Sequence, residues 1–172
     1  MKILFDADTL AQRTRLLAQE ITQQYDEIDE PIVVVGVLRG SFIFMADLAR
    51  CLDRPLEVDF MSASSYGDGT VSSGTVQLKT DLRSDIAGRH VLVVEDIVDT
   101  GHTLKKLRGI LMARQPASLK FVSLLDKPSR REVDEKADWL GFTIEDLFVV
   151  GYGLDCAGLD RNLPFVGVKQ ID

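Results

Sequence analysis

The stretch that decides the fold is VLVVEDIVDTGHTL, residues 91–104. Its first four residues are apolar and predict a strand that is covered on both faces. Two consecutive carboxylates, Glu95 and Asp96, end that strand, and a short polar turn leads into a helix expected over residues 103–114, where leucines recur on one face. A buried strand, a turn and a helix in this order form the building unit of an α/β protein.

Segments on either side repeat the alternation of strand and helix. Asp8 and Thr9 open an expected first helix, in which Thr9 and Gln12 form a capping box. A second helix is expected over residues 42–51. Further strands are expected over residues 32–38, 56–60, 76–79, 119–125 and 147–150. The predicted fold class is therefore α/β: a single domain over residues 1–172 with a mainly parallel twisted sheet flanked by helices.

Composition narrows the classes of partner. The 172 residues include 20 Lys and Arg against 27 Asp and Glu, a net charge of −7, and 45% are hydrophobic, as in one soluble globular domain. The acidic balance argues against non-specific binding to nucleic acid, which depends on Lys and Arg. The sequence has no apolar run of membrane-spanning length, no leader pattern, and no metal-binding or disulfide motif around Cys51 and Cys156. We therefore expect a cytoplasmic protein with no membrane or nucleic-acid partner.

Residues 62–75 separate two of the expected strands and contain five Ser and three Gly. Such a composition does not bury itself, and loops longer than about 12 residues inside a domain often act as lids or binding loops. We therefore expect a flexible loop that serves as a lid. A hairpin connection without a function of its own is the alternative.

The turn after the acidic pair offers the groups that bind a phosphate monoester. Residues 99–103 place free backbone N–H groups, hydroxyls and the positive end of a helix dipole together. Glu95 and Asp96 can accept hydrogen bonds from vicinal hydroxyls or help to hold a hydrated Mg²⁺. A ligand with both a phosphate and a diol would satisfy these groups. An acidic helix-capping turn and the pocket of a phosphoacceptor receiver domain remain alternatives, whereas the sequence contains no P-loop or dinucleotide-binding motif.

Residues 95–103, EDIVDTGHT, resemble the phosphoribosyl-pyrophosphate signature of the type I phosphoribosyltransferases. Further segments resemble the purine branch of that family, which acts on hypoxanthine and guanine. They are residues 38–41 (LRGS), the pair Ser65 and Tyr66, residues 123–127 (SLLDK), and residues 148–155 (FVVGYGLD) followed by Arg161. The resemblance implies the type I phosphoribosyltransferase fold with a small hood. It also implies transfer of a phosphoribosyl group to a purine with release of pyrophosphate.

The resemblance assigns roles to the acidic pair and the turn. Glu95 and Asp96 are expected to hold the ribose hydroxyls, with Mg²⁺ as the cofactor. Asp99 is expected to be the general base that accepts the proton from N7 of the purine as N9 attacks. The residues expected to bind the 5′-phosphate are Asp99, Thr100, Gly101, His102 and Thr103.

The resemblance also assigns the purine, the pyrophosphate and the lid. The purine is expected to contact Lys127, Phe148, Val149 and Asp155, with Lys127 donating a hydrogen bond to the 6-oxo group. The pyrophosphate is expected to contact Arg39, Gly40 and Arg161. The resemblance implies two metal contacts: Mg²⁺ at Glu95 and Asp96, and a second Mg²⁺, bound to the pyrophosphate, at Asp155. Ser65 and Tyr66 are the expected lid residues. The family shows a cis peptide at the position of Leu38 and Arg39, whose state the sequence does not fix.

Two other functions stay open at this point: a xanthine-preferring enzyme, and a non-catalytic regulator of the same fold that binds nucleotide and RNA or DNA. Family members usually form dimers or tetramers, so a homo-oligomer is expected. Core packing is the default interpretation of Cys51, Cys156, His90 and Trp139.

Overall fold

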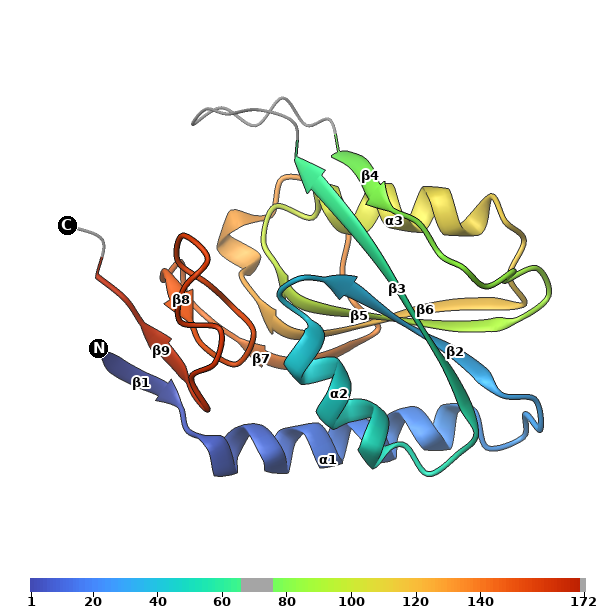
Figure 1. Cartoon of the computed structure of the whole chain (residues 1–172), viewed down its shortest axis with the longest axis horizontal. Coiled ribbons are helices and arrows are strands. Elements are labelled where there is room, and N and C mark those ends of the chain that lie inside the picture. Colours follow the sequence, from blue (N-terminus) through green and yellow to red (C-terminus); the bar gives the residue numbers. More distant parts are fainter. Residues whose placement is uncertain (66–75, 171–172) are drawn as a thin grey trace.

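The centre of the protein is a six-stranded sheet, seen in a computed structural model that describes residues 1–65 and 76–170 (Figure 1). Its strands lie in the order β4-β3-β2-β5-β6-β7. Their bounds are β2 (Ile32–Leu38), β3 (Leu56–Ser65), β4 (Val76–Thr80), β5 (His90–Val98), β6 (Ser118–Asp126) and β7 (Trp139–Thr143). All neighbouring pairs are parallel except β3 and β4, which form an antiparallel hairpin. The predicted α/β class with a mainly parallel sheet is confirmed.

Helices cover both faces of this sheet. Helices α1 (Ala7–Gln24) and α2 (Phe42–Cys51) pack against each other on one face, and α3 (His102–Met112) covers the other. Strand β2 explains the uninterrupted apolar run in the sequence. Ile32 and Val34 point into the core under α1 and α2, whereas Val33 and Val35 point into the core under α3. A strand buried on both faces needs apolar residues at every position.

A second, antiparallel sheet lies beside the first and forms the small hood. Its strands β1 (Lys2–Phe5), β9 (Val166–Val168) and β8 (Val149–Val150) join both ends of the described chain, and Lys2 pairs with Val168. Figure 1 shows this hood at one end of the main sheet. Strands β1, β7 and β9 were not predicted, because only their pairing with other strands defines them.

Several predicted boundaries are wrong, and local contacts give the reasons. Helix α1 begins at Ala7 and is capped by Asp6, which accepts a hydrogen bond from the N–H of Thr9 at 2.8 Å, so Thr9 is not the cap. Strand β8 contains only Val149 and Val150 of the predicted residues 147–150, because Leu147 closes a turn onto the carbonyl of Glu145. Helix α3 ends at Met112 rather than residue 114, since the chain turns at Gln115 with φ 57°.

Two further corrections bear on the site. Strand β5 continues through Val98, so Glu95 and Asp96 lie within the strand rather than at its end, because β6 pairs alongside as far as Asp126. Strand β3 continues to Ser65, since its last residues pair with β4 in the hairpin. Cross-strand pairing here outweighs the weak strand preference of serine. The predicted loop over residues 62–75 is therefore shorter at its start, and residues 66–75, including Tyr66, lie outside the described residues.

The remaining sequence expectations concern membranes and cysteines. None of the helices in the described part of the chain is long and apolar enough to cross a bilayer. Core packing is the wrong interpretation for Cys51, which is exposed, and for Cys156, which is half-buried outside the core clusters; both are free thiols. Trp139 packs against the core, and His90 lies within 2.7 Å of the Ser118 hydroxyl.

Candidate active site

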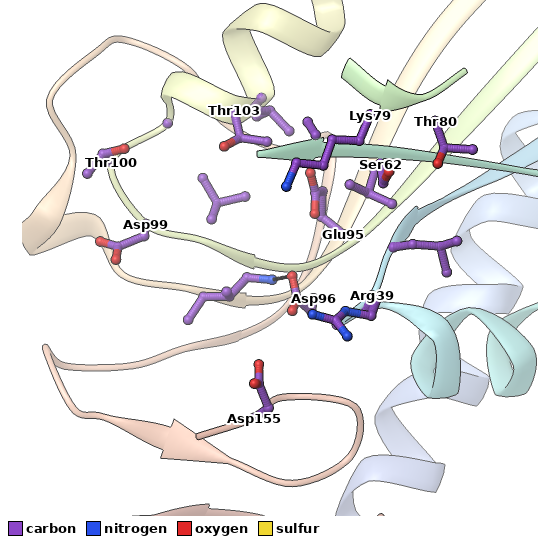
Figure 2. Close-up of a pocket in the computed structure, with 18 of the residues that line it drawn as sticks. Arg39, Ser62, Lys79, Thr80, Glu95, Asp96, Asp99, Thr100, Thr103 and Asp155 are labelled. Carbon is purple, nitrogen blue, oxygen red and sulfur yellow. Dashed lines mark hydrogen bonds between the residues drawn. The ribbon is translucent and has the colours of Figure 1, made fainter. Parts of the chain in front are cut away.

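A cavity of about 770 Å³ opens at the carboxyl ends of the parallel strands, the usual ligand position in α/β proteins. Residues from β2, the β3–β4 hairpin, β5 with its following turn, and the hood line it (Figure 2). The predicted site residues that line it are Arg39, Gly40, Glu95, Asp96, Asp99, Thr100, Gly101, Thr103, Asp155 and Arg161. Segments far apart in the sequence therefore meet in one place.

Other predicted residues lie elsewhere. Lys127, Phe148 and Val149 do not line this cavity, and the side chain of His102 lines a separate groove beside α3. The imidazole of His102 turns to Glu132, with Nε2 2.7 Å from the carboxylate. Only the backbone N–H of His102 stays in the turn, where it donates to Oγ1 of Thr100 at 3.4 Å.

Burial controls the protonation of the acidic pair. Glu95 is 6% exposed, and burial together with the nearby charge of Asp96 raises its pKa well above the ordinary value. Burial also raises the pKa of Asp96 to about 6, although the N–H of Ile97 donates to its carboxylate at 2.9 Å and Arg161 lies near enough to oppose the rise. A bound cation or hydroxyl donors would stabilise the ionised forms of these two neighbouring carboxyl groups, which burial disfavours.

A divalent cation fits this acidic pair only with help from a ligand. The described residues contain no group of three or more His, Cys, Asp or Glu side chains arranged to hold a metal ion by themselves. Mg²⁺ commonly binds through one or two carboxylates, with substrate phosphate oxygens and waters completing an octahedron. Glu95 and Asp96 can supply these one or two carboxylate ligands.

The turn between β5 and α3 has the expected form for an anion. Gly101 adopts φ 89° as the residue before α3, and a Cβ there would come within 2.9 Å of Val133. The left-handed conformation and the close neighbour both favour glycine. Thr100 and Thr103 line the cavity on either side of it (Figure 2).

The loop after β2 packs directly onto Asp96 of the acidic pair. The peptide bond between Leu38 and Arg39 is cis, the state seen in the family that the sequence resembles. A Cβ on Gly40 would overlap Oδ2 of Asp96, and a Cβ on Gly153 of the hood would overlap the carbonyl oxygen of Gly40. Asp96, Gly40 and Gly153 therefore form a close stack from the sheet to the hood.

Arg161 and Asp155 form the hood side of the cavity. Nη2 of Arg161 lies 2.7 Å from Oδ1 of Asp155, and Nη1 donates to the carbonyl of Gly153 at 2.7 Å. The other carboxylate oxygen of Asp155 accepts a hydrogen bond from the N–H of Gly158 at 2.7 Å. These contacts hold a cation and an acid at the cavity wall.

An ion-pair chain connects the cavity to Lys127. Asp99 pairs with Nε of Arg130 at 3.1 Å, and Arg130 reaches Asp146 at 3.5 Å. Nζ of Lys127 lies 3.6 Å from the same Asp146 carboxylate. Lys127 is 8% exposed, and its N–H donates to the carbonyl of Val98, so its backbone is fixed to the end of β5.

Sequence reasoning missed several residues of this region. Ser62, Lys79 and Thr80 line the cavity from the β3–β4 hairpin, and Figure 2 shows the Lys79 side chain reaching into it. Arg130 and Asp146, the partners of Asp99 and Lys127, were also missed. A signal for Lys79 existed, because it lies in an expected strand next to the predicted lid.

The parallel strands thus open onto an acidic pair, a helix-opening turn and two arginines, and an antiparallel hood stands beside them. This combination of fold and site defines a type I phosphoribosyltransferase. The family model described as "Phosphoribosyl transferase domain" matches residues 2–157.

Individual relatives narrow the class. A hypoxanthine phosphoribosyltransferase of Haemophilus influenzae is 52% identical over 167 residues, covering 96% of this chain and 93% of the relative. A hypoxanthine-guanine phosphoribosyltransferase of Aquifex aeolicus is 49% identical over 166 residues, covering 96% and 93%. The crystal structure of a hypoxanthine-guanine phosphoribosyltransferase of Bacillus anthracis has a TM-score of 0.93 at 45% identity and covers 99% of both chains. The chain belongs to the phosphoribosyltransferase family, in its hypoxanthine phosphoribosyltransferase branch.

Proposed function

We propose that this protein transfers the phosphoribosyl group of 5-phosphoribosyl 1-pyrophosphate to hypoxanthine or guanine, forming IMP or GMP and pyrophosphate, in purine salvage. One observation supports this above all. A single cavity brings the phosphate-type turn, the buried acidic pair and the Arg161–Asp155 pair together. These three groups match the three polar parts of the sugar substrate, which are the 5′-phosphate, the vicinal diol and the diphosphate. The names of the relatives do not favour the xanthine-preferring or regulatory alternatives.

The reaction breaks the bond from C1 of the ribose to diphosphate and forms a bond from C1 to N9 of the purine. Positive charge develops on the ribose ring as the diphosphate leaves, as in glycosyl transfer. Glu95 and Asp96 hold the ribose hydroxyls beneath that ring. Arg39, the backbone of Gly40 and Arg161 hold the departing diphosphate, for which guanidinium groups are suited.

Asp99 accepts the proton from N7 of the purine. Its carboxylate lies in the cavity wall and is 40% exposed as a side chain, so a ligand can reach it. The ion pair with Arg130 places one carboxylate oxygen and leaves the other for the purine. Backbone groups of Thr100, Gly101 and His102, with the Thr103 hydroxyl, bind the 5′-phosphate.

Lys127 selects the purine. An ammonium group only donates hydrogen bonds, so it suits the 6-oxo group of hypoxanthine and guanine and opposes the 6-amino group of adenine. Phe148, which is 38% exposed, stacks on the base, and the main chain at Val149 and the region of Asp155 meet its pyrimidine edge. An unpaired buried donor costs about 1 to 3 kcal/mol, which corresponds to roughly 10- to 100-fold discrimination against adenine.

We propose Mg²⁺ as the cofactor: Glu95 and Asp96 would hold one ion at the ribose hydroxyls, and Asp155 would hold a second one that arrives with the diphosphate. When bound, Mg²⁺ would offset the negative charge of the departing diphosphate. The raised pKa values of Glu95 and Asp96 give a reason for its presence, because a cation between them favours their ionised forms.

The proposed assembly follows the family. Residues 1–172 act as one domain, and the protein forms a dimer or tetramer of identical chains. Sedimentation velocity at micromolar concentration tests the assembly, since a monomer there would reject it.

Initial rates with hypoxanthine, guanine, xanthine and adenine, each with phosphoribosyl pyrophosphate and Mg²⁺, test the function. We expect pyrophosphate release with hypoxanthine or guanine and values of kcat/KM at least tenfold lower with adenine. Turnover of xanthine alone, or of adenine as fast as hypoxanthine, would reject the proposal.

A further inference from the structure

The hood reaches the cavity through a segment with an unusual backbone. Gly151, Tyr152 and Gly153 are consecutive and have φ values of 96°, 50° and 104°. Glycine adopts such angles freely, but a bulky residue such as tyrosine rarely does. Tyr152 therefore needs contacts that hold it in this conformation.

The Tyr152 side chain makes one such contact, with helix α2 outside the hood. Tyr152 is 6% exposed, and its hydroxyl donates to Oδ2 of Asp47 at 2.6 Å. Asp47 lies in α2, the helix that begins two residues after Gly40. Burial, followed by the hydrogen bond to Asp47, raises the pKa of the Tyr152 phenol far above its ordinary value, so the phenol keeps the proton that it donates.

The residue after Tyr152 touches the site from two sides. Gly153 donates its N–H to the carbonyl of Arg161 at 2.9 Å and accepts from Nη1 of the same arginine at 2.7 Å. Its Cα also packs against the carbonyl oxygen of Gly40, with no room for a Cβ. The position of Gly153 therefore fixes both the Arg161 guanidinium and the loop after β2.

The purine side of the hood is held in a different way. Val149 and Val150 pair with Val168 and Gly167 of β9, and the carbonyl of Phe148 accepts from the N–H of Lys169 at 3.0 Å. None of these contacts involves Tyr152 or Asp47. Loss of the Tyr152–Asp47 hydrogen bond should therefore weaken binding of the diphosphate more than binding of the purine.

We propose that Tyr152 and Asp47 are positioning residues for diphosphate binding, acting through Gly153 on Arg161 and on the Arg39–Gly40 loop. Neither residue lines the cavity. Their bond ties the hood to α2, so that Arg161 and the loop after β2 stay together at one wall of the cavity. This inference rests on the proposed function, because it assigns the diphosphate to that wall.

The test compares Tyr152→Phe, Asp47→Ala and Asp47→Asn with the wild type. Phenylalanine keeps the ring and loses the hydrogen bond, alanine loses the acceptor, and asparagine keeps an oxygen that can accept from the tyrosine. Arg50→Gln is the matched control, because the exposed Arg50 pairs with Asp47 on the side away from Tyr152 and lies outside the site. Initial rates give KM for phosphoribosyl pyrophosphate and for hypoxanthine, and calorimetry gives Kd for pyrophosphate with Mg²⁺.

We expect Tyr152→Phe and Asp47→Ala to raise the KM for phosphoribosyl pyrophosphate and the Kd for pyrophosphate by about 3- to 10-fold, the effect of one hydrogen bond. The KM for hypoxanthine should change less than twofold. Asp47→Asn and Arg50→Gln should stay within about twofold of the wild type in every value. Equal increases in both KM values, unchanged diphosphate binding, or failure of both the Tyr152→Phe and Asp47→Ala proteins to fold would overturn the inference. A wild type without transferase activity would reject the proposed function, and the pyrophosphate titration would still decide the inference.

Discussion

Asp96→Asn should stabilise the free protein at neutral pH while it impairs catalysis. Burial raises the pKa of Asp96 in the folded protein to about 6, against an unperturbed 3.8, so the folded state holds the proton more tightly than the unfolded state. Below about pH 4 the Asp96 carboxyl is protonated in both the folded and the unfolded state, so it does not lower the free energy of unfolding. Between pH 4 and 6 the folded state loses stability as the pH rises, and above pH 6 the full cost is present.

The size of the effect follows from the same two pKa values. At roughly 1.36 kcal/mol per pH unit, their difference corresponds to about 3 kcal/mol of unfolding free energy as an upper limit. Asparagine has nearly the same shape and keeps an oxygen to accept from the N–H of Ile97, so the substitution removes the charge without leaving a cavity. It also removes the negative neighbour that helps to raise the pKa of Glu95, which acts in the same direction.

Urea unfolding of both proteins, with a chelator and without substrate, measures this difference at pH 4.5, 6.0 and 7.5. We expect the variant to be more stable than the wild type by about 1 to 3 kcal/mol at pH 7.5 and by much less at pH 4.5. Mg²⁺ with phosphoribosyl pyrophosphate should reverse the order, because the wild-type carboxylate binds them and the amide does not. A variant that is less stable at pH 7.5, or a difference that does not change with pH, would refute the reasoning.

Four further substitutions test other parts of the site and its support. Asp59→Asn should change stability with pH in the opposite direction to Asp96→Asn. Burial tends to raise the pKa of Asp59, but hydrogen bonds from the N–H groups of Ser84, Phe60 and Arg83 outweigh burial and lower the pKa. The wild type should therefore lose its advantage over this variant as the pH falls below about 4 in urea unfolding. Asp99→Asn should lower kcat by about 10²- to 10⁴-fold, the contribution of a general base, and change the KM for phosphoribosyl pyrophosphate far less; an unchanged kcat would remove Asp99 from that role. Gly40→Ala should destabilise the protein by about 1 to 3 kcal/mol and reduce activity, because its Cβ overlaps Asp96, and a fully active, equally stable variant would contradict that packing. Lys79→Gln should raise the KM for phosphoribosyl pyrophosphate severalfold at low salt and less at high salt, whereas Lys105→Gln on the outer side of α3 should leave it unchanged.

The sequence predicted the parts of the fold that depend on local pattern. Strand β2 and helix α2 have the expected bounds because a continuous apolar run and a helical run define them without help from the rest of the chain. Strands β1, β7 and β9 depend on partners far away in sequence, such as Val168 for Lys2, so their own residues carry little signal. The end of β3 at Ser65 follows from its hairpin partner in the same way.

The residues of the candidate site were likewise predicted where they belong to a local motif and missed where distant contacts define them. Residues that belong to a contiguous motif, Glu95 to Thr103, line the cavity as expected except for the His102 side chain. That imidazole turns away because Glu132 lies 2.7 Å from it, and no local pattern connects two residues thirty positions apart. Arg130 and Asp146 were missed for the same reason: their importance lies in the ion pairs they make with Asp99 and Lys127.

The arrangement of charge explains why the cavity suits a ligand that is anionic at both ends. Glu95 and Asp96 lie at its floor, where burial penalises their ionised forms, and Arg39, Lys79 and Arg161 lie around its wall. A sugar with phosphate groups at both ends, carrying a divalent cation, brings negative charge to the wall and positive charge to the floor. Under the proposed function, substrate binding therefore brings counter-charges to the basic wall and to the acidic floor at the same time.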